Sequence, residues 1–391
     1  MKKVYLDNAA TTAVTKPVLD AMMPYLTQIY GNPSSLHEYG RESRNAIDRA
    51  REQVSKAINA VSAAEIVFTG CGTESDNTVL FGVAEKLKDK GNHIITTAVE
   101  HHAVLYAAQT LEKRGYEVTY LPVDEYGMVS VKQVEDAITD KTILVSVMFA
   151  NNEVGTIMPI EQIGHVCRSR GVLFHTDAVQ AVGHLPIDVQ KMDIDMLSLS
   201  AHKFHGPKGV GALYVRKGAI RLPSFMVGGA QETNRRAGTE NTAGIVGLGA
   251  AIEIATNNLE KNTKQMTKLR DMLMRGIEQR IPAVKLNGHP TERLPNNVNY
   301  SIKYIEGEGM LLWLDLSGIA ASSGSACTSG SLDPSHVLLA MGLKHETAHG
   351  SVRMTLSEQT SAEDIDYVLD VFPGIVKKLR DMSPLYNGQE D

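Results

Sequence analysis

The sequence has few cysteines and no long hydrophobic run. Its 391 residues include three cysteines, Cys71, Cys167 and Cys327, which lie far apart and form no CxxC pair. This spacing argues against a disulfide framework or a cysteine-ligated metal site, and we predict no metal. No apolar stretch approaches membrane-spanning length, and the start of the chain lacks the apolar core of a signal peptide. We therefore predict a cytoplasmic protein that does not enter a membrane.

An excess of positive charge is also missing. The formal net charge is -6, which gives no electrostatic reason to expect nucleic acid or an acidic membrane surface as a partner. The chain has no repeat at a fixed period and no low-complexity segment. With 43% hydrophobic and 21% charged residues, it has the composition of a globular protein with a large core and two or three domains.

Short apolar runs alternate with helical stretches from residue 65 to about residue 200. The runs are nearly continuous, as expected of strands covered on both faces. They predict an α/β fold whose large domain has a mainly parallel sheet and binds ligands at the carboxyl ends of its strands. Later short strands mix with helices and predict a smaller α+β domain. We assign residues 16–258 to the large domain, and residues 1–15 and 259–391 to the small one. The predicted strands of the large domain are 66–68, 94–97, 118–121, 143–147, 172–175 and 196–199.

One lysine follows a predicted buried strand in a small, polar setting. Lys203 comes directly after the apolar run 194–199 and is followed by a glycine-rich stretch. Desolvation at such a place lowers the pKa of the amine and makes it nucleophilic. That chemistry suits a Schiff base with pyridoxal 5′-phosphate, whereas an ordinary lysine beside a turn is simply solvated.

Polar residues also follow three other predicted strands. Gly72 and Thr73 open a helix whose first N–H groups can bind a phosphate, with Thr73 as its cap; an ordinary glycine turn is the alternative. Asp177 can pair with the protonated pyridine nitrogen of the cofactor; a helix-capping aspartate is the alternative. His101 can stack on an aromatic ring of a ligand and transfer protons near neutral pH; an exposed histidine at a strand end is the alternative.

Three further residues offer polar groups to a ligand. Gln180 can hydrogen-bond a phenolic oxygen, and Asn152 can reach the substrate or that same oxygen. Arg353 lies in a strand-like alternation and can hold an α-carboxylate through two parallel hydrogen bonds; an exposed strand arginine is the alternative.

Cys327 lies in the middle of ten small residues, 322–331, without apolar neighbours. Free cysteines are usually buried and inert, so a cysteine in an exposed small-residue loop indicates a nucleophile. A surface cysteine of no consequence is the alternative. We place Cys167 in the core, because it lies in a helical pattern, and Cys71 in the phosphate-binding turn.

Together these stretches resemble the cysteine desulfurases, the NifS/IscS group of the class V aminotransferases, which have the type I fold of pyridoxal-phosphate-dependent transferases. The resemblance covers nearly the whole chain, and it is the joint order and spacing of the motifs that is specific. The motifs are residues 5–12, 31–35, 73–77, 151–155, 200–203 and 323–327.

The resemblance implies a role for each matching residue. The residues implied for the cofactor are Lys203 as its Schiff-base partner, Asp177 at the pyridine nitrogen, Gln180 and Asn152 near the phenolic oxygen, His101 stacked on the ring, and Gly72, Thr73, Ser200 and His202 at the phosphate. Thr239 would reach the phosphate of the other subunit, which implies a homodimer. Asn152 and Arg353 would hold the substrate.

As function, the resemblance implies an L-cysteine desulfurase. Lys203 and His101 would transfer protons, and Cys327 would take the sulfur as a persulfide, leaving L-alanine. The sulfur would pass to an iron–sulfur scaffold protein or another acceptor.

Two alternatives remain beside that function. A selenocysteine lyase or related class V aminotransferase fits the long small-residue loop around Cys327 less well. A non-catalytic sulfur carrier or scaffold has no need for Lys203, Asp177 and Cys327 together.

The sequence departs from the family pattern in two places. Residues 70–73 read Gly-Cys-Gly-Thr where many housekeeping members have Ser-Gly-Ala-Thr, and the chain stops soon after residue 386, without the IscS-type scaffold-docking tail.

Overall fold

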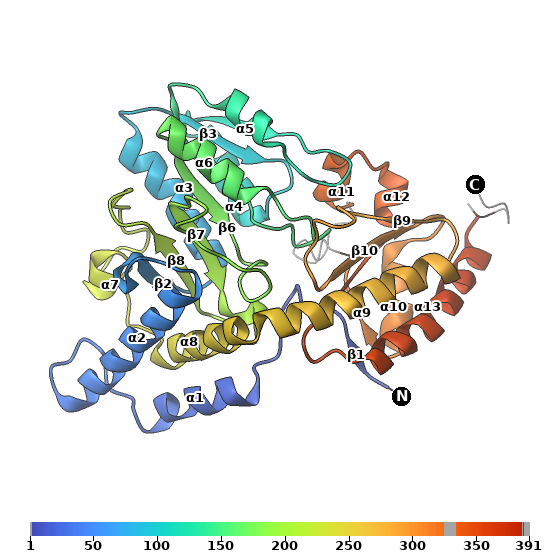
Figure 1. Cartoon of the computed structure of the whole chain (residues 1–391), viewed down its shortest axis with the longest axis horizontal. Helices are drawn as coiled ribbons and strands as arrows, with labels where there is room; N and C mark the ends of the chain where they lie inside the picture. Colours follow the sequence, from blue (N-terminus) through green and yellow to red (C-terminus); the bar gives the residue numbers. More distant parts are fainter. Residues whose placement is uncertain (1, 324–333, 385, 387–391) are drawn as a thin grey trace.

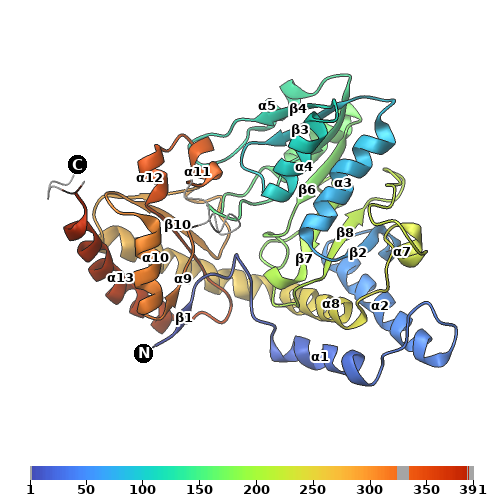
Figure 2. The same cartoon turned by 180° about the vertical axis from the view of Figure 1, so that it is seen from behind.

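The computed structural model describes residues 2–323, 334–384 and 386. Its elements form a larger and a smaller group, and helices α8 (Thr242–Asn257) and α9 (Leu259–Arg280) run one after the other along both groups (Figure 1). Seen from behind, the first residues of the chain cross from the smaller group to the larger one (Figure 2). The predicted domain boundary near residue 258 falls between α8 and α9, and the division into two domains stays a prediction.

A seven-stranded sheet forms the centre of the larger group. Its strand order is β2-β8-β7-β6-β5-β3-β4, and β8 runs in the direction opposite to the other six strands. This confirms the predicted α/β fold with a mainly parallel sheet. The strands are β2 (Ile66–Thr69), β3 (His93–Thr97), β4 (Glu117–Leu121), β5 (Thr142–Ser146), β6 (Leu173–Asp177), β7 (Met196–Ser200) and β8 (Gly211–Val215).

The sequence analysis missed β8. This strand follows the glycine-rich stretch after Lys203. Because β8 turns back antiparallel onto β7 and pairs with β2, it lies outside the strand-and-helix alternation that revealed the other six strands.

Separate hydrophobic clusters cover the two faces of the sheet. On one face Ile94 packs with Val83 of α3 (Gly72–Leu87) and Val104 of α4 (His102–Glu112). On the other face Phe174 packs in a cluster that contains Leu248 of α8 and residues of α2 (Glu38–Ala57). Since side chains alternate along a strand, the neighbours of Phe174 in β6 point toward the α3 face. The remaining helices of the larger group are α1 (Lys16–Thr27), η1 (Ala63–Glu65), α5 (Val131–Ala137), α6 (Ile160–Arg170), η2 (Ala201–Lys203) and α7 (Gln231–Asn234).

Both ends of the chain contribute to the smaller group. Its hydrophobic cluster contains Leu6 from the first residues and Ile365 from the last helix. The antiparallel sheet has the order β12-β10-β9, and β1 pairs in parallel with β11. The elements are β1 (Val4–Tyr5), β9 (Val284–Leu286), β10 (Asn297–Ile302), α10 (Gly307–Leu316), β11 (Ile319–Ala320), β12 (Ser351–Thr355) and α13 (Ala362–Met382). Between β11 and β12, α11 (His336–Ala340) and α12 (His345–His349) place their buried side chains in the hydrophobic cluster of the larger group. Among the described residues, no helix combines the length and apolar content needed to cross a membrane.

Candidate active site

The candidate site lies where β6 and β7 end beside the start of α3. The register of these strands places Asp177 opposite Ser198, and Ser200 follows two residues later on the same face. A side chain added at Gly72, the first residue of α3, would lie 3.7 Å from the Cβ of Ser200. Asp177 and Ser200 from two strands and Gly72 from a helix, all predicted to contact the cofactor, therefore meet at one edge of the sheet.

Lys203 lies at the end of η2, directly after β7, and is partly buried. Its Nζ donates to the carbonyl oxygens of Ala9 at 2.7 Å and Ala10 at 2.8 Å. Gln180 donates to the same Ala9 oxygen at 2.9 Å. The first residues of the chain thus form one wall of the site, and the amine of Lys203 is held at that wall.

Asp177 is buried at the end of β6. One of its carboxylate oxygens accepts a hydrogen bond of 2.9 Å from the N–H of Val179. Burial raises the pKa of this carboxyl, while the Val179 N–H and the charge of Lys203 act in the opposite direction. A cation placed against Asp177 would compensate the desolvation of its carboxylate.

His101 caps the start of α4, where its Nδ1 accepts a hydrogen bond of 3.1 Å from the N–H of Ala103. Burial first, and then the charges of Lys203 and two neighbouring histidines, lower the pKa of His101 to about 4. The ring is therefore neutral at pH 7. Because Nδ1 accepts, its proton is on Nε2.

The start of α3 has the features of an anion site. Its cap residue is Cys71, whose side chain makes no capping hydrogen bond, so the prediction that Thr73 caps this helix is wrong. A Cβ on Gly72 would lie 2.7 Å from a methyl group of Val179, so only glycine lets the helix begin this close to the end of β6. The buried hydroxyl of Ser200 has no hydrogen-bond partner within the described part of the chain. The first N–H groups of α3 and this hydroxyl suit a phosphate.

His202 lies beside the same strand end. Its Nδ1 is 3.1 Å from the hydroxyl of Thr11. Burial is the main cause that lowers the pKa of His202 to about 4, with Lys203 and Lys208 acting in the same direction. At pH 7 this ring is a neutral hydrogen-bonding group.

Arg353 is buried in β12, which excludes the alternative of an exposed strand arginine. Its guanidinium donates to the carboxylate of Asp7 at 2.9 Å and to the backbone oxygen of Asn152 at 3.0 Å. Its Nε has no hydrogen-bond partner among the residues that the structure describes. Arg353 therefore joins the first residues of the chain to the loop that contains Asn152, and its Nε–H is available to a ligand.

Cys327 lies outside the described residues, but both flanks of its stretch end at the site. Ser322 pairs with Arg353 through a backbone bridge. On the other flank, Ser335 donates a hydrogen bond to the carboxylate of Glu153, the neighbour of Asn152.

Thr239 does not join the other predicted cofactor residues through any contact the structure gives. It is exposed at the surface. Its neighbour Arg236 forms an ion pair of 2.8 Å with Glu74 in the first turn of α3. The stretch that contains Thr239 is thus fixed near the start of α3.

The sequence analysis assigned no role to three buried titratable residues near Asp177: Asp76, Glu100 and His175. Burial raises the pKa of Glu100 to about 8. A signal for Asp76 was available, because Leu80 and Val83 follow it at helical spacing and a carboxyl on such an apolar face is unusual.

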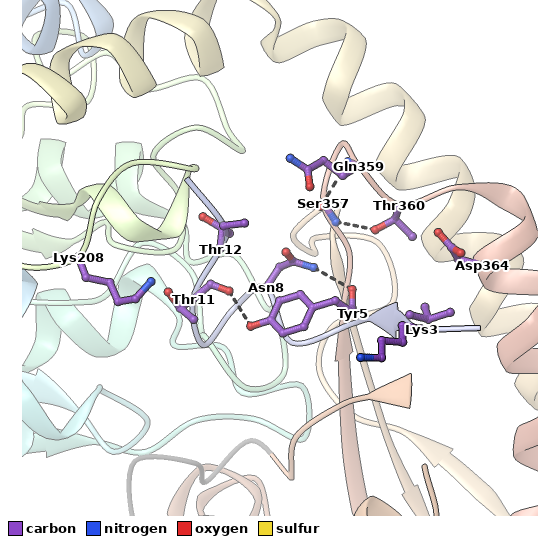
Figure 3. A pocket seen from close by; sticks show the side chains of 12 residues that line it. Lys3, Tyr5, Asn8, Thr11, Thr12, Lys208, Ser357, Gln359, Thr360 and Asp364 are labelled. Atoms are coloured by element: carbon purple, nitrogen blue, oxygen red, sulfur yellow. Dashed lines mark hydrogen bonds between the residues drawn. The ribbon is translucent and has the colours of Figure 1, made fainter. Parts of the chain in front are cut away.

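A separate cavity of about 470 Å³ borders the same N-terminal stretch (Figure 3). Tyr5 crosses it and donates a hydrogen bond of 2.9 Å to the backbone oxygen of Thr11. None of the predicted site residues lines this cavity. It lies against the first residues of the chain, and its lining is mostly polar or charged.

The arrangement of Lys203, Asp177 and the start of α3 on this sheet suits a pyridoxal-phosphate-dependent transferase. Residues 4–368 match the family model described as aminotransferase class-V. The chain belongs to this family and, within it, to the cysteine desulfurases of the IscS/NifS group. Pyridoxal phosphate is the cofactor that this family implies, and the residues described above fit it.

Similar proteins support this placement over almost the full chain. "Cysteine desulfurase IscS" of Clostridium botulinum (strain Hall) is 58% identical over 98% of this chain and 97% of its own length. A solved structure called "NIFS-LIKE PROTEIN" is 39% identical with a TM-score of 0.91, covering 97% of this chain and 100% of that one. The structure "SspA in complex with cysteine" is 37% identical with a TM-score of 0.81, covering 92% and 100%.

Proposed function

We propose that this chain removes the sulfur of L-cysteine, leaving L-alanine, and that Cys327 receives the sulfur as a persulfide. The observation that carries the proposal is the position of Lys203, beside Asp177 and the start of α3. The proposal is also supported by relatives named cysteine desulfurase, which this chain matches over nearly their whole length.

The cofactor would be held by residues that the fold brings to one edge of the sheet. Bound pyridoxal phosphate supplies an electron sink for bonds at the substrate's α-carbon. The residues proposed to hold it are Lys203, Asp177, Gln180, Asn152, His101, Gly72, Thr73, Ser200 and His202. The buried Ser200 hydroxyl without a partner supports the phosphate position.

The amine of Lys203 would move the proton of the substrate's α-carbon. The neutral ring of His101 would stack on the cofactor and carry a proton on Nε2. Arg353 and Asn152 would hold the substrate carboxylate. Because the guanidinium of Arg353 already binds Asp7, its direction is fixed before the substrate arrives.

The sulfur step balances with the thiol of Cys327 as the nucleophile. Its sulfur forms a bond to the substrate sulfur while the carbon–sulfur bond of cysteine breaks. The electron pair of that bond stays on carbon, which takes a proton and becomes the methyl group of alanine. The enzyme then carries a persulfide, which a sulfur acceptor can receive.

The decisive experiment compares three single substitutions, each assayed for alanine and sulfide with cysteine and a reductant. Cys327→Ala should stay yellow and change its spectrum on addition of cysteine, yet release almost no sulfide. Cys167→Ala should keep its activity, because Cys167 is buried in the core. Cys71→Ala should at most weaken cofactor binding. Sulfide release by Cys327→Ala at the parent rate would contradict the assignment and point to Cys71.

The assembly and the acceptor are part of the same proposal. We propose a homodimer in which Thr239 reaches the phosphate of the partner's site, and the exposure of Thr239 supports this. An iron–sulfur scaffold protein or another acceptor would take the sulfur. The cytoplasmic location stays a prediction.

A further inference from the structure

Asp76 is a buried carboxyl that none of the roles above uses. It lies near the start of α3 and is 1% exposed. One of its oxygens has no hydrogen-bond partner in the described part of the chain and lies 3.6 Å from Nε2 of His175. A buried carboxyl with an unsatisfied oxygen is costly, which points to a use for it.

Asp76 belongs to a polar network that crosses three strands. His175 in β6 contacts the hydroxyl of Ser146 in β5 at 2.8 Å and that of Ser198 in β7 at 3.0 Å. The hydroxyl of Ser198 also acts on Asp76, where it favours the ionised carboxylate. His175 and Asp177 are two residues apart in one strand, so both point to the α3 face. The network therefore lies next to Asp177, on the same face of the sheet.

The charges around Asp76 leave it without a cation. Burial lowers the pKa of His175 to about 3, so this ring is neutral and does not balance a carboxylate. Asp177, Glu100 and Cys71 also face Asp76, and each of them opposes its ionisation. Burial raises the pKa of Asp76, and the Ser198 hydrogen bond opposes that shift only in part.

The groups around Asp177, unlike the charged groups around Asp76, favour the ionised carboxylate. It accepts the Val179 N–H, and the charge of Lys203 favours its ionised form. Two neighbouring buried carboxyls do not ionise together, so such a pair holds one proton. The contacts on the two sides decide which of them holds it.

We propose that Asp76 is a positioning residue that keeps the proton of the Asp76–Asp177 pair, so that Asp177 stays ionised for the cofactor's ring nitrogen. As an acid, Asp76 presents a neutral O–H group to Nε2 of His175, which lies 3.6 Å from its unpartnered oxygen. The proposal rests on the cofactor that the family implies and not on sulfur transfer. It is tested without cysteine, so a failure of the desulfurase proposal would leave it standing.

The first test titrates apoprotein with pyridoxal phosphate at neutral pH and follows absorbance. Asp76→Asn copies the protonated acid, so its affinity should stay within about threefold of the parent. Asp177→Asn removes the charge and should lose at least about thirtyfold, as expected when one partner of a buried charge pair is removed. A loss in Asp76→Asn as large as that in Asp177→Asn would overturn the proposal, because Asp76 would then supply charge.

The second test follows urea unfolding of apoprotein against pH. A carboxyl whose folded pKa is raised contributes stability below its unfolded pKa and loses it as pH rises toward the folded value. Relative to Asp76→Asn, the unfolding constant of the parent should therefore rise by up to about tenfold per pH unit above about pH 4. Val79→Ala removes buried packing from the same helix and should shift stability equally at every pH. If the unfolding constants of the parent and Asp76→Asn differed by the same factor at every pH, Asp76 would not hold a proton in the folded protein.

Ser198→Ala keeps the test decisive if Asp76→Asn does not fold. Removing the hydroxyl takes away a group that favours ionised Asp76, so Asp76 should hold its proton more tightly. Parent-like affinity for pyridoxal phosphate is then expected. A tenfold or greater loss of affinity would show that Asp76 acts in its ionised form.

Discussion

The ionisation of the site side chains is set by burial more than by ion pairs. Burial is the first cause that lowers the pKa of His101 and His202 to about 4 and raises that of Glu100 to about 8. At pH 7 the histidine rings whose pKa is affected by the charge of Lys203 are thus neutral. The imidazoles do not compete with the lysine as charged acids.

His101→Asn tests this at a single residue. Asparagine is a good helix cap and can replace the Nδ1 acceptor of α4, so the fold and the cofactor should be retained. Loss of the ring should lower kcat about a hundredfold. Since His101 has a pKa of about 4, the parent rate should also fall as the pH drops toward 4, and the variant should lack that decline. Unchanged rates and pH profile would argue against a role in proton transfer.

The start of α3 is the element on which the phosphate site depends. It approaches the end of β6 closely only because residue 72 is glycine. The first turn is further held by Glu74, which accepts the Gly70 N–H at 2.7 Å and pairs with Arg236. The direction of its free N–H groups is therefore fixed before an anion binds.

Gly72→Ala should weaken pyridoxal phosphate binding to the apoprotein by about tenfold or more, because the new Cβ would displace the helix start from Val179. The double variant Gly72→Ala/Val179→Ala removes the contacted methyl group and should regain part of the affinity. Gly82→Ala lies in the same helix, and its Cβ would meet the end of the flexible Leu222 side chain, so it serves as the control. No rescue in the double variant would show that the clash with Val179 is not the cause.

The sequence predicted the elements better than their contacts. Strands such as β5 and β6 were recognised because buried parallel strands are continuous apolar runs. The polar stretches at their ends gave the candidate site. The contacts of Ala9 and Ala10 with Lys203 were not predictable, because backbone oxygens carry no sequence signal. The Asp7–Arg353 ion pair joins residues 346 positions apart and follows only from the packing of both chain ends in one group.

At the scale of the whole molecule, many polar contacts join the larger group to the smaller one near the site, such as those of Arg353 with Asn152 and of Asn299 with Glu153. One of them is a pair of titratable side chains. His205, in the loop after η2, contacts Glu358 after β12 at 3.0 Å. Burial of His205 lowers its pKa, but the hydrogen bond and the charge of Glu358 outweigh burial and raise it, and the same contact lowers the pKa of Glu358. This pair should make the attachment of the two groups depend on pH.

Glu358→Gln should lower the free energy of unfolding by about 1 kcal/mol near pH 6, where both groups are charged. The raised pKa of His205 means that its contribution is present below its unfolded pKa and is lost as the pH rises through the folded one. The difference between parent and variant should therefore shrink by about pH 9, which urea unfolding at both pH values would measure. If the free energies of unfolding of parent and variant differed equally at both pH values, the effect would come from packing and not from the charge of His205.

Mixed subunits test the proposed homodimer. Lys203→Ala subunits lack the lysine, and Thr239→Glu subunits present a negative charge to the partner's phosphate. Each variant alone should be inactive, whereas dimers refolded from an equal mixture should regain about a quarter of the parent activity, because each hybrid has one intact site. Sedimentation would confirm the dimer. Inactive mixtures would place Thr239 at its own subunit's site.

The pairing of β1 with β11 also governs the order of events during synthesis on the ribosome. Val4 pairs with Ile319, so the second strand emerges roughly 300 residues after the first. At about 5–20 residues per second, the first strand waits about 15 to 60 s for its partner. The wall that holds the amine of Lys203 is thus among the first segments made and among the last to be locked. Chaperones that bind nascent chains have that interval in which to protect it.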